Sequence, residues 1–204
     1  MKNLFILALI PLLAGCGSEP VAEEKTNADT VKAQDAEKLL NDSLKQAEQG
    51  TRPALNSIEE LCRAVFATVQ SGDTAAYLNL LPSYPEIETM ISKANLTGQE
   101  KELIITGYPE NKKKEEVKAV ERFVLTVKAG RDSGIAWKEA QYLEPRTSVQ
   151  MTPAGFEQAV EIAVLFTYKS KIYELRLGDC IKTHSGWRVS SRIKYDGIPD
   201  ELVK

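Results

Sequence analysis

Few side chains in this sequence could carry chemistry: three cysteines, one histidine and one acidic residue, Asp179, in a predicted strand. A thiolate can bind a metal, form a disulfide or accept an acyl group, and a carboxylate with a tuned pKa can act as a general base. One histidine and three widely separated cysteines do not form the cluster that a zinc site needs. The sequence also lacks the motifs of nucleotide-binding and serine-hydrolase enzymes. We therefore expect no metal and no cofactor.

Cys16 follows a segment with the layout of a secretion signal. Lys2 gives a positive start, residues 4–13 form an apolar run too short to span a bilayer, and small residues precede the cysteine. The run Leu13-Ala14-Gly15-Cys16 resembles the lipobox of bacterial lipoproteins. This resemblance implies that residues 1–15 are a signal peptide and that Cys16 becomes acylated. The alternative is an ordinary secretion signal followed by an incidental cysteine.

The resemblance to lipoproteins also implies a location. Gly17 stands where an aspartate would suggest retention in the inner membrane, which favours the outer membrane, with the protein facing the periplasm. Several acyl chains would hold the chain on the membrane through Cys16. Residues 16–50 are then the lipidated cysteine and a tether. Residues 17–50 contain eight acidic, four basic and no aromatic side chains, which predicts a flexible or partly helical segment.

Residues 51–204 have the length of one domain, and the first half is predicted to be helical. Apolar residues recur there at three- and four-residue spacing, and a Ser or Thr precedes a Glu by three residues at several predicted helix starts. These capping pairs are Ser57 with Glu60, Ser83 with Glu86, and Thr97 with Glu100. Asp73 can begin a further short helix, and residues 107–109 predict a break before the last one.

After residue 130, apolar residues recur at every second position. Residues 160–168, 173–177 and 187–193 alternate as strands do, and residues 136–143 could add an edge strand. Turn residues at Ser170 and at 184–186 predict hairpins, and hence an antiparallel meander. Helices followed by strands indicate an α+β fold in which N-terminal helices cover one face of an antiparallel sheet.

This order of elements resembles the NTF2-like (cystatin-like, SnoaL-like) superfamily. In that superfamily, N-terminal helices fill the concave face of a curved antiparallel sheet, giving a cone that serves isomerases, dehydratases and non-catalytic binding modules alike. The fold alone therefore does not determine the activity. The residues that carry the resemblance are Val65-Phe66-Ala67, Ser71-Gly72-Asp73, Tyr77, Leu80-Leu81, Gly186-Trp187-Arg188-Val189 and Ile193.

If the protein is an enzyme, Asp179 is the candidate general base. The orientation of Asp179 depends on Gly178. In a regular strand Asp179 would face inward, whereas a bulge at Gly178 would turn Asp179 out and Cys180 in. His184 lies in a predicted turn and is not expected to be catalytic. Four aromatic residues could line a pocket in the cone, or could simply be core: Tyr77, Tyr168, Tyr173 and Trp187.

Cys62 and Cys180 remain once Cys16 is acylated. An even pair in an oxidising compartment could form a disulfide between the first helix and the sheet. The alternative is that Cys62 is a small buried apolar residue on its helix and Cys180 is an unrelated thiol.

The charge of residues 51–204 argues against nucleic acid as a partner, because basic and acidic side chains are equal in number, 21 of each. Four basic residues share one strand parity and are expected on the outward, solvated face of the sheet: Arg176, Arg188, Arg192 and Lys194. The favoured function is a membrane-anchored, non-catalytic binding module for a small apolar ligand or a protein partner. The alternatives are an isomerase or dehydratase that uses Asp179, and a structural subunit of the envelope.

We predict that Cys16→Ser leaves the protein unacylated and out of the membrane fraction, because the Cys16 thiol is the expected acylation point. Metabolic labelling with a fatty-acid analogue, followed by fractionation, measures both effects. Equal label on the wild type and the variant would contradict the lipoprotein interpretation.

Overall fold

The computed structural model describes residues 38, 41–47, 50–189 and 192–199. The predicted signal peptide, Cys16 and most of the predicted tether lie outside these residues. Residues 41–47 are helical, and Leu44 and Ala47 pack against the hydrophobic core. This part of the predicted tether is therefore in contact with the domain.

The helices of the first half begin at the predicted capping residues. They are α2 (Ile58–Ser71), α3 (Thr74–Leu78), α4 (Tyr84–Lys93) and α5 (Gly98–Asp132). The predicted capping residues begin each of them, and the boxes at Ser83 and Thr97 are complete, with the glutamate bonding back to the cap. Gly72 ends α2 in the left-handed conformation that glycine adopts without strain.

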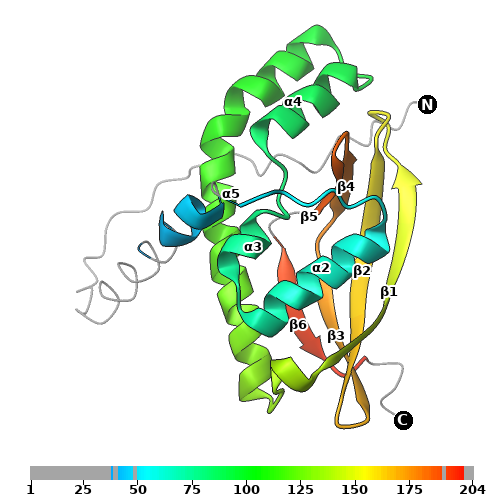
Figure 1. Ribbon diagram of the computed structural model, residues 1–204. Helices are drawn as coiled ribbons and strands as arrows, with labels where there is room; N and C mark the ends of the chain where they lie inside the picture. Colours follow the sequence, from blue (N-terminus) through cyan, green and yellow to red (C-terminus); the bar gives the residue numbers. More distant parts are fainter. Residues whose placement is uncertain (1–37, 39–40, 48–49, 190–191, 200–204) are drawn as a thin grey trace, which may run out of the picture.

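The predicted break at residues 107–109 is wrong, because α5 runs through Pro109 without interruption. Packing against α4 offsets the hydrogen bond that proline cannot donate. The rings of Tyr84 and Tyr108 lie 5.8 Å apart, and the Tyr108 hydroxyl donates to the carbonyl of Pro82 at 3.2 Å. In Figure 1, α4 and the first half of α5 project together beyond the end of the sheet.

A short 3-10 helix, η1 (Trp137–Glu139), leads into a six-stranded antiparallel sheet that curls without closing. One edge of β2 pairs with β1, and its other edge is shared by β3 and β4. The outer strands are β5, next to β4, and β6, next to β3. The strands are β1 (Gln141–Met151), β2 (Glu157–Tyr168), β3 (Lys171–Leu177), β4 (Cys180–Thr183), β5 (Gly186–Val189) and β6 (Ile193–Gly197).

The α+β class and the curved antiparallel sheet are confirmed, but the simple meander is wrong. The predicted strand over residues 187–193 is two strands, β5 and β6, which pair with β4 and β3 respectively and therefore lie at opposite ends of the same edge of β2. The cause lies at Gly178, whose N–H donates to the carbonyl of Arg192 at 2.9 Å and separates β3 from β4. On the facing strand, Glu161 has a φ of 53°, and the β1–β2 register shifts there.

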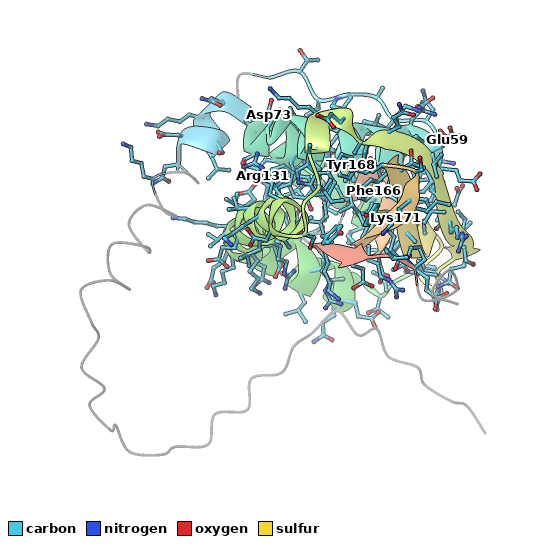
Figure 2. The ribbon with its side chains drawn as sticks, turned by 90° about the horizontal axis from the view of Figure 1, so that it is seen from below. Glu59, Asp73, Arg131, Phe166, Tyr168 and Lys171 are labelled. Carbon is cyan, nitrogen blue, oxygen red and sulfur yellow. The ribbon has the colours of Figure 1, made fainter. Side chains whose placement is uncertain are left out.

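The core lies between the helices and the concave face of the sheet. Aromatic rings dominate its centre: Phe66 packs on Phe166 at 5.4 Å, and Tyr77 stacks on Phe123 at 4.7 Å. Figure 2, seen from below, shows side chains filling the space between the helical layer and the strands around Phe166 and Tyr168. Buried side chains of this size each contribute about 1.5–3 kcal/mol to folding, so the filled layer is the main source of stability.

Trp137 joins the end of α5 to this core. Its indole N–H donates to the carbonyl of Val127 at 2.9 Å, and its ring lies 5.3 Å from that of Phe166. The ring rests directly on the backbone of Gly130, where an added Cβ would stand 2.0 Å from the nearest ring carbon. Only glycine leaves room for this contact.

We expect Gly130→Ala to lower the free energy of unfolding by about 1–3 kcal/mol, because the methyl group must displace the buried Trp137 ring. Denaturant unfolding measures the change. Gly107→Ala is the matched control in the same helix, since its added Cβ meets nothing closer than 3.6 Å. The control should stabilise α5 by about 0.5–1 kcal/mol. Equal effects of the two substitutions would contradict the role given to Trp137.

Candidate functional site

The four aromatic residues proposed for a pocket lie in the core. Tyr77, Tyr168 and Trp187 are buried members of the main cluster, and Tyr173 is half-buried against it, with its ring stacked on Phe166 at 5.6 Å. None of the four lines either of the two surface pockets that flank His184. The concave face of the sheet is thus occupied by the side chains of the chain itself.

Asp179 and Cys180 follow the orientation expected for an interrupted strand. Asp179 is exposed between β3 and β4, whereas Cys180 is fully buried. Cys62 is also fully buried, and both residues are thiols, with no disulfide in the described part of the chain. Burial raises the pKa of the Cys62 thiol to about 12, with Glu59 adding to the shift. The Cys180 thiol donates to the carbonyl of Gly178 at 3.6 Å.

The prediction that Arg188 faces outward is wrong, because this side chain is only 1% exposed. Although β5 is an outer strand, the segment before α2 runs beside it: the N–H of Trp187 donates to the carbonyl of Leu55 at 2.7 Å. Gly186 permits this approach, since an added Cβ would lie 2.4 Å from the Leu55 carbonyl oxygen. Arg176 remains more than half exposed, at 58% of its side chain, as expected.

Arg188 is neutralised by Glu86, a residue 4% exposed at the start of α4. The Arg188 guanidinium donates to one carboxylate oxygen of Glu86 through Nε at 2.8 Å and Nη2 at 2.7 Å. The hydroxyl of Ser185 donates to the same oxygen, while the N–H and hydroxyl of Ser83 donate to the other at 2.7 and 2.8 Å. Arg188 also donates to the carbonyl of Pro53 at 3.0 Å. One ion pair therefore joins the segment before α2, α4 and the β4–β5 turn.

The sequence contains only part of the signal for this network. The Ser83-x-x-Glu86 spacing identifies Glu86 as a helix cap, which is confirmed. Nothing in the local pattern connects Glu86 with Arg188, which lies 102 positions further along the chain. Burial alone would raise the pKa of Glu86, but hydrogen bonds from Ser185, Ser83 and Arg188 outweigh it and lower the pKa to about 2.

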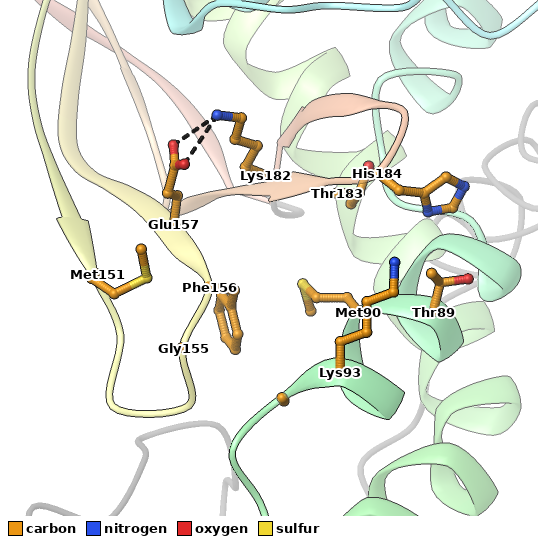
Figure 3. A pocket seen from close by; sticks show the side chains of 11 residues that line it. Thr89, Met90, Lys93, Met151, Gly155, Phe156, Glu157, Lys182, Thr183 and His184 are labelled. Carbon is orange, nitrogen blue, oxygen red and sulfur yellow. Dashed lines mark hydrogen bonds and ion pairs between the residues drawn. The ribbon is translucent and has the colours of Figure 1, made fainter.

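Two pockets flank His184 in the exposed β4–β5 turn. The smaller, of about 220 Å³, lies over the Glu86–Arg188 pair. The larger, of about 270 Å³, lies between α4, the β1–β2 hairpin and β4 (Figure 3). We call the larger one the α4–hairpin groove and define it by Met90, Lys93, Met151, Phe156, Lys182 and His184.

A backbone hydrogen bond and an ion pair hold the walls of the α4–hairpin groove in place. The N–H of Asn95, just after α4, donates to the carbonyl of Ala154 in the hairpin loop at 2.8 Å. Lys182 forms an ion pair with Glu157 across β4 and β2, with Nζ 2.9 and 3.0 Å from the two carboxylate oxygens. The groove is therefore a defined feature of the fold, lined by the apolar side chains of Met90, Met151 and Phe156 together with the charged ones of Lys93, Glu157 and Lys182.

Comparison of the chain with protein-family models, with curated proteins and with solved structures gave no match. Among the described residues, no group of three or more His, Cys, Asp or Glu side chains could hold a metal ion. In the same residues, no helix is both long and apolar enough to cross a bilayer.

We expect Glu86→Gln to lower the free energy of unfolding at pH 7 by about 3 kcal/mol, because Arg188 would then be buried without a counter-charge. The pKa of Glu86 is lower in the folded chain than its ordinary value of 4.5, so its stabilisation is complete above about pH 5 and is lost as the pH falls towards about 2.

Denaturant unfolding at several pH values tests both effects, and the variant should lose part of the acid sensitivity of the wild type. Glu88→Gln, an exposed carboxylate on the same helix, is the control and should change stability by less than about 0.5 kcal/mol. An unchanged pH profile in Glu86→Gln would show that the ion pair does not stabilise the fold.

Proposed function

We propose that this chain is a lipid-anchored, periplasm-facing binding module without catalytic activity, and that its partner is a protein. One observation carries the choice between a protein and a small apolar ligand: the concave face of the sheet is filled. Phe66, Tyr77, Phe166 and Trp187 occupy the place where an NTF2-like cone would hold a ligand. Binding must then use the outside of the domain.

The alternative function, an isomerase or dehydratase, needs a carboxylate that can act as a general base, and neither Asp179 nor Glu86 suits that role. Asp179 is exposed between β3 and β4, outside the concave face where an enzyme of this kind would bind its substrate. Glu86 is buried, but a carboxylate that accepts several hydrogen bonds and has a pKa of about 2 is a poor general base. The alternative of a purely structural subunit needs no groove, whereas the α4–hairpin groove is a surface suited to a partner.

The size of the α4–hairpin groove also favours a protein. Pockets for drug-sized ligands usually enclose about 300–1,000 Å³, and this groove holds about 270 Å³. Such a volume suits one or two anchoring side chains from a larger surface. Met151, on the hairpin, is 63% exposed at the edge of the groove and would remain accessible to a protein partner.

The anchor would keep this groove close to the membrane. Residues 17–40 separate Cys16 from the helical residues 41–47 that pack on the core, and 24 residues extend at most roughly 80 Å. A partner in the membrane or in the adjacent periplasm is therefore within reach of the domain.

A photo-crosslinking amino acid placed at position 151 tests the proposal in cells that make the lipid-anchored chain. We expect a protein adduct of defined mass from this site, because the partner would cover Met151. Leu103 on α5 is the matched control, since it is equally exposed, at 68% against 63%, but lies outside the groove. Absence of a protein adduct at position 151, or equal adducts at both positions, would contradict the proposed function.

A further inference from the structure

We infer that the α4–hairpin groove recognises a partner segment in which an apolar side chain is closely followed by a carboxylate. This inference rests on the proposed function and specifies the chemistry of the partner. Two properties of the groove carry it: the apolar residues that line its interior and the charge at its rim that has no counter-ion.

The apolar lining of the groove consists mainly of half-buried Met90 and Phe156, with Met151 exposed at its edge. In Figure 3, Phe156 stands between Met151 of the hairpin and Met90 of α4. Methionine side chains adapt their shape to different apolar partners, and their sulfur atoms make favourable contacts with aromatic rings. Because the volume is about 270 Å³, the groove accommodates a leucine- or phenylalanine-sized anchor with its adjoining backbone.

The charge of the groove is positive. Lys182 is already neutralised by Glu157, which holds its ammonium group with both oxygens. Lys93 is exposed at the end of α4 and has no ion-pair partner among the described residues. Glu86 in the neighbouring pocket is neutralised by Arg188. An acidic residue next to the anchor would therefore meet the remaining positive charge at Lys93.

A peptide fits these features better than a long acyl chain. The hydrogen bond between Asn95 and Ala154 joins the two walls of the groove just after α4. Polar side chains from Lys93, Glu157, Lys182 and His184 interrupt the apolar lining, so an extended chain of methylene groups has no continuous apolar surface to follow. A side chain needs only a short pocket, and its backbone can leave over the open rim.

The sequence supplies the reporters for a test. The chain contains three methionines, and the two that follow the signal peptide are Met90 and Met151, both in the groove. The mature chain, residues 16–204 with Cys16→Ser so that no detergent is needed, can be labelled with ¹³C at the methionine methyl groups. Both methyl signals then report on the groove.

Three probes are titrated into this chain: acetyl-Gly-Leu-Glu-Gly-amide, acetyl-Gly-Leu-Lys-Gly-amide and decanoate. We expect both methyl signals to move with the acidic peptide, which should bind about threefold more tightly than the basic one, as one exposed ion pair allows. Lys93→Gln should abolish this preference. Lys171→Gln, an exposed lysine in the hairpin at the other end of β2, is the matched control and should keep it.

Equal binding of the two peptides would overturn the inference about charge. Stronger shifts with decanoate than with either peptide would assign the groove to an acyl chain, and no shift with any probe would also overturn the inference. The crosslinking result separates these outcomes from failure of the proposed function. A protein adduct at position 151 would leave the protein-binding role standing even where the peptide preference fails.

Discussion

The buried ion pair between Glu86 and Arg188 determines how the helical half of the chain meets the sheet. It connects the first turn of α4 to β5, and through Pro53 it also fixes the segment that leads into α2. Two charges removed from water are costly unless each is fully hydrogen-bonded, and here Ser83 and Ser185 complete the carboxylate. The position of α4 follows from this pair. The α4–hairpin groove is the space left between α4, in this position, and the β1–β2 hairpin.

The second constraint is the distribution of neighbouring strands between the two edges of β2. β1 occupies one edge along its whole length, so β3 and β4 must share the other edge, with the interruption at Gly178 facing the irregularity at Glu161. Bulges of this kind increase the local twist and bend a strand, and the sheet curls around the helices. The same interruption leaves Asp179 in solvent and Cys180 in the core. A single local feature thus decides the orientation of both residues.

These two constraints together support a partner outside the cone. The curled sheet is filled by aromatic side chains from its own strands and from α2 and α5. The end of the sheet next to α4 instead presents an apolar groove with a positively charged rim. The proposed membrane anchor and the proposed groove would act together: lipidation at Cys16 would restrict where the domain can go, and the groove would select the partner that it meets there.

The sequence by itself determined the features that depend on neighbouring residues. Capping pairs such as Ser83 with Glu86 act within four positions, and turn residues such as Ser170 act within two, so helix starts, hairpins and the α+β class could be predicted. Glycine and proline at 107 and 109 gave a wrong break, because the contacts of Tyr108 with α4 outweigh the local preference. Only the tertiary structure decided that Arg188 is buried against Glu86, that β6 pairs with β3 instead of continuing β5, and that Met90 faces the hairpin. Each of these depends on residues that are well separated in the sequence, which are brought together by the path of the chain and not by any local pattern.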